Sequence, residues 1–160
     1  MKMIKVIPEN CTGCRLCEVT CSFAHYRVST PELRRIHIVK EEERGDHAVR
    51  LCIQCADAPC IESCPAEALN RDEKTGVVLV DEHECIGCGN CEDACPIGAV
   101  YMHPEDDVAI KCDLCGGDPE CVQICAREAL RVEEMELTDP SKNLFLEKTS
   151  EQLRNLIGGN

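Results

Sequence analysis

The chain has 160 residues, enough for one domain or two small lobes, and it contains no Trp, two Phe and two Tyr with which to build a core. Its formal net charge of -13 argues against nucleic acid as a partner, because phosphate binding needs clustered Lys and Arg. Sixteen residues are cysteine. At this density, a covalent or metal framework should supply much of the folding free energy that a thin aliphatic core cannot.

The N-terminal segment, residues 1–8, lacks the apolar run of a secretory signal. No stretch approaches the roughly 18 apolar residues of a membrane span. We therefore expect a cytoplasmic protein without a direct membrane span. In a reducing cytoplasm, closely spaced cysteines are more often metal ligands than disulfides.

The cysteines fall into four quartets, and every quartet closes with a gap of three residues. In the first and third quartets the two earlier gaps are both two residues long. In the second and fourth quartets the middle gap is widened to four and five residues. In chain order the quartets are Cys11, Cys14, Cys17, Cys21; Cys52, Cys55, Cys60, Cys64; Cys85, Cys88, Cys91, Cys95; and Cys112, Cys115, Cys121, Cys125. No cysteine is left over.

The surroundings of the quartets repeat as well. A short apolar or β-branched run precedes each quartet, and we expect strands at residues 4–7, 49–51, 77–80 and 108–110. After three quartets an Ala and an aliphatic residue recur, at 68–69, 99–100 and 129–130, where we expect a short helix with no room for a larger side chain. A strand, a cysteine loop and a short helix, four times over, indicate duplication of a ferredoxin-like module.

One insertion interrupts the repeats at residues 31–48. Ile36 and Ile38 followed by the turn Arg44-Gly45-Asp46 predict a hairpin. This hairpin either covers the cysteine-rich body or contacts a partner.

The segment 133–160 contains no cysteine. Within it, Thr149 and Gln152 have the spacing of a capping box, and we predict a docking helix at 150–157. So short a helix is not stable alone, so it must pack on its own body, on another subunit or on a second copy of the chain.

The quartet spacing is suited to a 4Fe-4S cubane. Such a cluster has four iron corners that each need a thiolate, and three closely spaced cysteines allow one loop to reach three of them. The last cysteine lies one helical turn further on, about 5.4 Å along the axis, and in two-cluster ferredoxins it ligates the other cluster of the pair. We therefore predict four 4Fe-4S clusters. Their charge would bring the protein to about -21 and favour a basic docking face on a partner.

Internal symmetry indicates which quartets exchange their last cysteine. The second and third quartets both end in Cys-Pro, at Pro65 and Pro96, which leaves the first quartet with the fourth. Each pair then contains one regular and one widened quartet. The predicted ligand sets are Cys11, Cys14, Cys17, Cys125; Cys52, Cys55, Cys60, Cys95; Cys85, Cys88, Cys91, Cys64; and Cys112, Cys115, Cys121, Cys21. Pairing of neighbouring quartets, first with second and third with fourth, remains the alternative.

Zinc and disulfides are the structural alternatives to clusters. A structural zinc draws four ligands to one point, usually from two separated CxxC pairs, whereas triplets followed by a fourth cysteine fit a cube better. A disulfide framework would need eight compatible bridges. The five histidines have no ligand-like spacing, and we expect most of them at the surface: His25, His37, His47, His83 and His103. No nucleophile or acid–base group indicates catalysis by this chain.

These observations predict an α+β protein with a duplicated bacterial ferredoxin-like fold, two pseudo-symmetric two-cluster lobes and a C-terminal helical tail. The four-cluster domain is expected at residues 1–132. One lobe takes about 1–30 and 105–132, the second lobe takes about 49–104, the hairpin is inserted at 31–48, and the extension takes 133–160.

Residues 4–132 resemble the four-cluster iron-sulfur subunits of molybdenum or tungsten oxidoreductases and some hydrogenases, the dimethyl sulfoxide reductase electron-transfer subunit type. The matching segments are Cys52-Ile-Gln-Cys55-Ala-Asp-Ala-Pro-Cys60-Ile-Glu-Ser-Cys64-Pro65, Cys85-Ile-Gly-Cys88-Gly-Asn-Cys91-Glu-Asp-Ala-Cys95-Pro96 and Lys111-Cys112-Asp-Leu-Cys115. In that family the quartets pair first with fourth and second with third, in agreement with the symmetry argument.

The resemblance implies an electron-transfer subunit that relays single electrons between a catalytic oxidoreductase subunit and a soluble redox carrier or further redox subunit. The short chain, with Ala126 where the family usually has Pro, is similar to the small subunits of tungsten aldehyde oxidoreductases in anaerobic metabolism. A free-standing polyferredoxin is the alternative function, although a carrier has little need of the cysteine-free tail. A zinc-organised scaffold is a third possibility from a different class.

Overall fold

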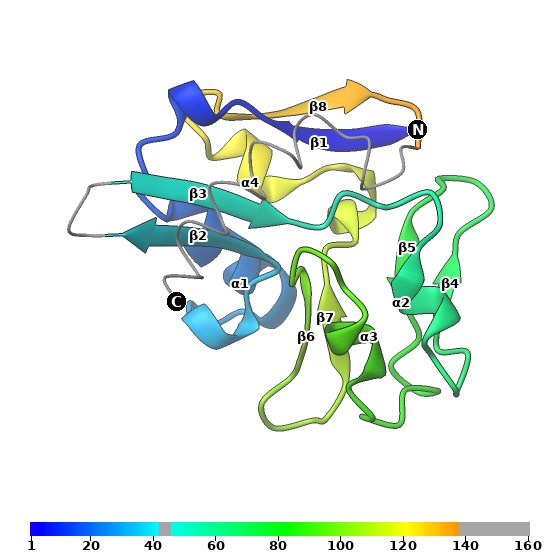
Figure 1. Cartoon of the computed structure of the whole chain (residues 1–160). Helices are drawn as coiled ribbons and strands as arrows, with labels where there is room; N and C mark the ends of the chain where they lie inside the picture. Colours follow the sequence, from blue (N-terminus) through cyan, green and yellow to red (C-terminus); the bar gives the residue numbers. More distant parts are fainter. Residues whose placement is uncertain (42–45, 138–160) are drawn as a thin grey trace.

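The computed structural model describes residues 1–41 and 46–137. Their strands form four two-stranded antiparallel sheets (Figure 1). The pairs are β1 (Lys2–Val6) with β8 (Leu130–Glu134), β2 (Ile36–Glu41) with β3 (Asp46–Leu51), β4 (Leu69–Arg71) with β5 (Val78–Val80), and β6 (Val100–Met102) with β7 (Ala109–Lys111). The strands expected before the quartets are present as β1, β3, β5 and β7, and the mixed α+β class is confirmed.

Each quartet has an α-helix that begins just before its third cysteine. These helices are α1 (Leu16–Tyr26), α2 (Pro59–Glu62), α3 (Asn90–Asp93) and α4 (Glu120–Gln123), with 3-10 helices at Pro8–Asn10, Pro31–Leu33 and Leu114–Gly117. In all four quartets the third cysteine is the second residue of the helix. Each helix therefore separates the third cysteine from the fourth by about one turn.

The prediction of a short helix after the quartets is wrong. In three repeats the third residue after the last cysteine has a left-handed backbone, with φ of 52°, 58° and 51° at Glu67, Gly98 and Glu128. This conformation ends a right-handed helical path. The chain turns there, and β4, β6 and β8 begin two residues later.

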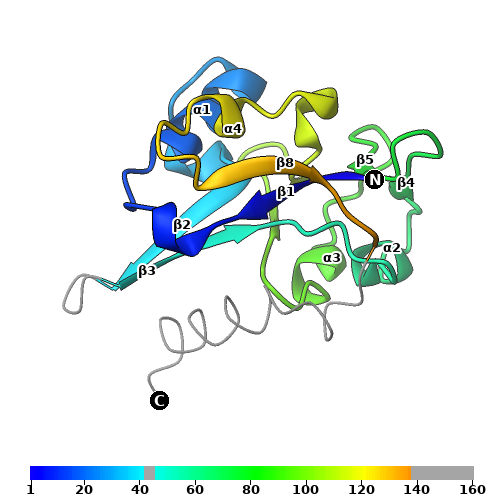
Figure 2. The same ribbon diagram turned by 90° about the horizontal axis from the view of Figure 1, so that it is seen from above.

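The first and last strands of the described chain lie side by side in both views (Figures 1 and 2). Val6 pairs with Leu130 and Lys2 with Glu134, and the backbone N–H of Met135 donates to the carbonyl of Met1 at 2.9 Å. Because β1 precedes the first quartet and β8 follows the fourth, this pairing brings quartets at opposite ends of the sequence together.

The predicted hairpin is confirmed as β2 and β3, although its turn residues 44 and 45 lie outside the described residues. Ile36 pairs with Leu51 and Ile38 with Val49, and all four side chains are buried. They pack in one hydrophobic cluster with cysteines of the first and fourth quartets. The hairpin therefore covers this part of the body.

Buried side chains form two separate hydrophobic clusters. The larger one comprises Val6, Cys21, Ile36, Ile38, Val49, Leu51, Val77, Cys112, Leu114, Cys121 and Leu130. The smaller one comprises Ala58, Leu69, Val78, Cys91, Val100 and Ala109. The predicted docking helix at 150–157 lies outside the described residues, and within them no helix has the length and apolar character that crossing a bilayer requires.

Candidate metal centres

Three cavities are each lined by four cysteines. They contain Cys11, Cys14, Cys17 and Cys125; Cys21, Cys112, Cys115 and Cys121; and Cys52, Cys55, Cys60 and Cys95. In every cavity three cysteines belong to one quartet and the fourth is the last cysteine of another. The grouping is that of three predicted ligand sets, and none of these cavities combines the first quartet with the second.

Three of the four remaining cysteines lie at the smaller hydrophobic cluster. Cys91 is part of that cluster, and Cys64 and Cys85 pack against it. Cys88 is exposed. These four cysteines form the remaining predicted set.

The last cysteine of each quartet accepts a backbone hydrogen bond at its sulfur. The donors are Ala68 to Cys64 at 3.3 Å, Ala99 to Cys95 at 3.2 Å, Ala129 to Cys125 at 3.3 Å, and Arg35 to Cys21 at 3.2 Å. The three alanines are buried, as their recurrence predicted. Hydrogen bonds of this kind stabilise a thiolate and raise the potential of a cluster that it ligates.

The first quartet departs from the repeat because its last cysteine lies inside α1. The fourth residue after Cys21 is His25 instead of an alanine. Because the helix continues to Tyr26, His25 lies within it and its backbone has helical geometry. The inserted segment supplies the missing donor through the N–H of Arg35. Sequence reasoning missed this replacement, and no local pattern indicated it.

Glycine is required in the loop between Cys85 and Cys88. Gly87 has a φ of +70°, and a Cβ there would lie 2.5 Å from the backbone oxygen of Asp107. A side chain at this position would displace the β6–β7 connection. The close approach explains the glycine in the third quartet.

The spread of the cysteines does not fit a single zinc ion. Tetrahedral Zn–S bonds of about 2.3 Å place the sulfurs about 3.8 Å apart. Among the described residues, ligand atoms of three or more His, Cys, Asp and Glu come within 4.8 Å of one another only at His25, Asp113 and Cys115. The three sets that line cavities surround a space instead of closing on a point, which is what a cube with four iron corners needs.

Burial makes several of these thiols difficult to ionise without a metal. Desolvation raises the pKa of Cys17 and Cys55 to about 12 and that of Cys91 to about 11. Metal ligation uses the thiolate. A cationic iron core is therefore the group that would stabilise these cysteines in ligating form.

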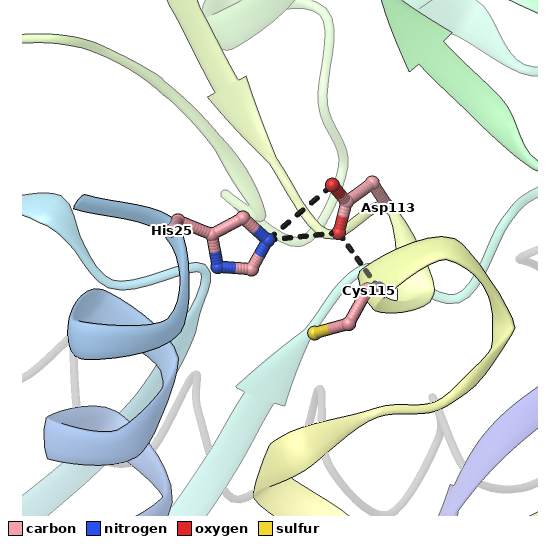
Figure 3. A group of neighbouring side chains, drawn as sticks. All are labelled: His25, Asp113 and Cys115. Carbon is pink, nitrogen blue, oxygen red and sulfur yellow. Dashed lines mark hydrogen bonds and ion pairs between the residues drawn. The ribbon is translucent and has the colours of Figure 1, made fainter. Parts of the chain in front are cut away.

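His25 and Asp113 form a charged network next to Cys115, the second cysteine of the fourth quartet (Figure 3). Nδ1 of His25 lies 2.9 Å from the carbonyl oxygen of Cys21 and Nε2 lies 3.1 Å from Oδ1 of Asp113, so both ring nitrogens donate. The hydrogen bond to Asp113, followed by one to Cys115, raises the pKa of His25 to about 12. Burial by itself would raise the pKa of Asp113. The hydrogen bond from His25 and the charge of Arg35 outweigh burial and lower this pKa, and Nη1 of Arg35 lies 2.5 Å from Oδ2 of Asp113. Two cations already neutralise this carboxylate, so we interpret the group as an ion-pair network.

The expectation that most histidines lie at the surface is wrong. His37 and His103 are buried, His25 and His47 are half-buried, and His83 is exposed. Three histidines have hydrogen-bond partners. His25 bonds to Asp113, His47 bonds to the carbonyl oxygen of Cys11, and Nδ1 of His103 accepts from the N–H of Asp106. A neutral or paired imidazole can be buried at low cost when its nitrogens have partners.

Comparison with known proteins gives a consistent family. Residues 44–135 match the 4Fe-4S dicluster domain, and residues 8–24 match a 4Fe-4S binding domain. The polyferredoxin-like subunit of the aliphatic sulfonate oxidoreductase of Pyrococcus furiosus is 45% identical over 132 residues, covering 81% of this chain and 76% of the relative. The thiosulfate reductase electron transfer subunit PhsB of Salmonella typhi is 36% identical over 139 residues, covering 77% and 70%.

A solved structure has a similar fold. The match is to a chain of the active site complex BamBC of benzoyl coenzyme A reductase as isolated, with a TM-score of 0.52 and 29% identity, covering 99% of this chain and 92% of that chain. Electron transfer without catalysis of its own, as predicted, is confirmed by these relationships. The chain belongs to the 4Fe-4S dicluster family of ferredoxin-type electron-transfer proteins.

Proposed function

We propose that this protein relays single electrons through four 4Fe-4S clusters between a catalytic oxidoreductase subunit and another redox carrier. The observation that carries the proposal is the grouping of four cysteines, from two distant quartets, around each of three cavities. When bound, the clusters supply one-electron redox chemistry. The chain supplies thiolate ligands, backbone hydrogen bonds to sulfur and apolar walls that exclude water.

We name each proposed cluster after the first cysteine of its loop. The ligand sets are Cys11, Cys14, Cys17, Cys125 for the Cys11 cluster; Cys52, Cys55, Cys60, Cys95 for the Cys52 cluster; Cys85, Cys88, Cys91, Cys64 for the Cys85 cluster; and Cys112, Cys115, Cys121, Cys21 for the Cys112 cluster. This assignment is supported by the burial of Cys112 and Cys121 in the larger hydrophobic cluster and of Cys91 in the smaller one.

The same packing supports a linear order of the clusters. Cys60 packs against the hydrophobic cluster that contains Cys91, and Cys52 packs against the one that contains Cys112. Cys17 also packs against the larger hydrophobic cluster, which contains Cys112. The proposed order is Cys85, Cys52, Cys112 and Cys11, with neighbours on the order of 10 Å apart, one helical turn plus two side-chain reaches.

Two lobes are part of the proposal. The pairing of β1 with β8 supports a division into residues 1–30 with 105–132 and residues 49–104. Contacts also cross this boundary, because β6 pairs with β7 and Val77 packs in the larger hydrophobic cluster. The hairpin 31–48 belongs with the first of these two lobes. The extension 133–160 is proposed as the dock for another subunit.

The relatives support a partner of a particular kind. One is named as a subunit of a sulfonate oxidoreductase, one as a subunit of a thiosulfate reductase, and the similar structure is part of a benzoyl coenzyme A reductase active site complex. We propose a tungsten or molybdenum oxidoreductase as the catalytic partner, in the cytoplasm. Anaerobic purification from the native source should yield a complex with a catalytic subunit, and a chain purified alone would favour the free-standing polyferredoxin.

The cluster assignment is tested by three single substitutions followed by EPR after dithionite reduction. The unsubstituted protein should contain about sixteen irons, four for each cubane. Cys21→Ser should alter the same EPR signal as Cys115→Ser and leave the signal altered by Cys17→Ser unchanged. If Cys21→Ser and Cys17→Ser alter one signal, the quartets do not exchange ligands; a colourless protein rich in zinc would overturn the proposal as a whole.

A further inference from the structure

A buried lysine lines one of the cysteine-lined cavities and directly precedes a cysteine of another. Lys111 ends β7 and is 2% exposed. Its side chain lines the cavity of the proposed Cys52 cluster, and it directly precedes Cys112 in the chain. Its ammonium group thus lies in the cavity of one proposed cluster and 3.0 Å from the carbonyl oxygen of Cys112, a ligand of another.

The ammonium group of Lys111 has only uncharged partners. Nζ lies 2.5 Å from the carbonyl oxygen of Val78, 3.0 Å from that of Cys112 and 3.5 Å from Oε1 of Gln54. Three acceptors need three N–H groups, which only the protonated lysine provides. Among the described residues no carboxylate forms an ion pair with Lys111.

Gln54 fixes the position of this charge. It is 1% exposed, its Oε1 accepts the N–H of Val78 at 2.9 Å, and its Nε2 donates to the carbonyl of Cys112 at 2.9 Å. Gln54 stands between two ligands of the proposed Cys52 cluster in the sequence. The network thus joins β5, the second quartet and the fourth quartet around one ammonium.

Burial of an ammonium among neutral oxygens is costly unless an opposite charge lies close by. Lys111 lines the cavity of the proposed Cys52 cluster with four cysteines, and it lines a second cavity with Glu82 and Asp113. The Asp113 carboxylate is already paired with His25 and Arg35. A cluster with four thiolates becomes more negative by one charge when it is reduced, so a fixed cation stabilises the reduced form more than the oxidised form.

We infer that the Lys111 ammonium raises the reduction potentials of the Cys52 and Cys112 clusters and so favours residence of the transferred electron at the junction between the two pairs of quartets. The inference rests on the proposed function. One electron from an external carrier or from dithionite is added in each reduction. No bond forms or breaks, and the lysine keeps its proton.

The test compares three variants in an anaerobic redox titration followed by EPR, with signals assigned through Cys55→Ser and Cys115→Ser. Lys111→Met removes the charge, Lys111→Arg keeps it, and Lys74→Met removes an equal charge from an exposed turn. Lys111→Met should make reduction of both adjacent clusters at least tenfold less favourable, a downward shift of 59 mV for a one-electron couple. Lys111→Arg and Lys74→Met should each change these equilibria by less than twofold.

Each outcome decides for or against the role of the charge. Unchanged potentials in Lys111→Met, or equal shifts of all four clusters, overturn the inference. Loss of the two adjacent clusters in Lys111→Met with retention in Lys111→Arg supports a requirement for charge, whereas equal loss in both variants shows that packing is what position 111 provides. Failure of the proposed function is recognised separately, because then the unsubstituted protein contains no clusters to titrate.

Discussion

The ion pair between Glu18 and Arg34 fastens α1 to the inserted hairpin. The Glu18 side chain is 6% exposed, and Oε1 lies 2.8 Å from Nε of Arg34. The same oxygen accepts the backbone N–H of Ile38 in β2 at 2.7 Å. Removing the carboxylate therefore leaves both a mostly buried guanidinium and a buried N–H without this partner.

Two substitutions separate these contributions. Glu18→Gln keeps an acceptor for Ile38 and removes the charge, at a cost of about 1–3 kcal/mol, the value of a charge-assisted hydrogen bond. Glu18→Ala removes both, and breaking a buried pair from one side costs about 3–5 kcal/mol. With about 2–4 °C per kcal/mol for a protein of this size, Glu18→Ala should lower the apparent melting temperature by roughly 6–20 °C.

The assay is thermal unfolding of the cluster-loaded protein under anaerobic conditions, followed by visible absorbance at one scan rate because unfolding releases iron irreversibly. The matched control is Glu133→Gln, which removes a carboxylate from an exposed pair with Lys5 at 2.9 Å. Exposed pairs contribute at most about 1 kcal/mol. If Glu18→Ala costs no more than this control, the assignment of the hairpin as a fastened cover is wrong.

Two further predictions concern packing and pH. Ala129→Val should lower the melting temperature, because overfilling a site where the present side chain is 3% exposed costs about 1–3 kcal/mol. Ala56→Val at an exposed position should leave the temperature almost unchanged, and equal effects of the two would contradict the tight contact. Burial, followed by the charges of Arg50 and Arg34, lowers the pKa of His37 from 6.5 to about 3. Between about pH 3 and pH 6.5 the His37 side chain therefore binds a proton in the unfolded chain but not in the folded chain. Stability should therefore be fully present above pH 6.5 and fall as the pH drops, by up to about 1.4 kcal/mol per pH unit. His37→Phe should flatten this loss in melting curves taken between pH 6.5 and 5, and an undiminished slope in the variant would refute the assignment.

The sequence determined those features that depend on near neighbours in the chain. The gaps between cysteines predicted cluster-binding loops, and the β-branched runs predicted the strands before them, because both follow from local backbone geometry. The recurring alanine was noticed, yet it was assigned to a helix. The left-handed residue before it was visible as a glycine only at Gly98, since Glu67 and Glu128 adopt the same conformation without that signal.

Tertiary structure decided which distant segments complete each site. The pairing of β1 with β8 places Cys125 in the cavity of the first quartet, and the inserted segment brings the N–H of Arg35 to Cys21. The burial of Lys111 in the cavity of the second quartet has the same origin. Such contacts join residues up to more than 100 positions apart, and their energies depend on a neighbourhood that exists only after the chain has packed, so no local pattern could specify them.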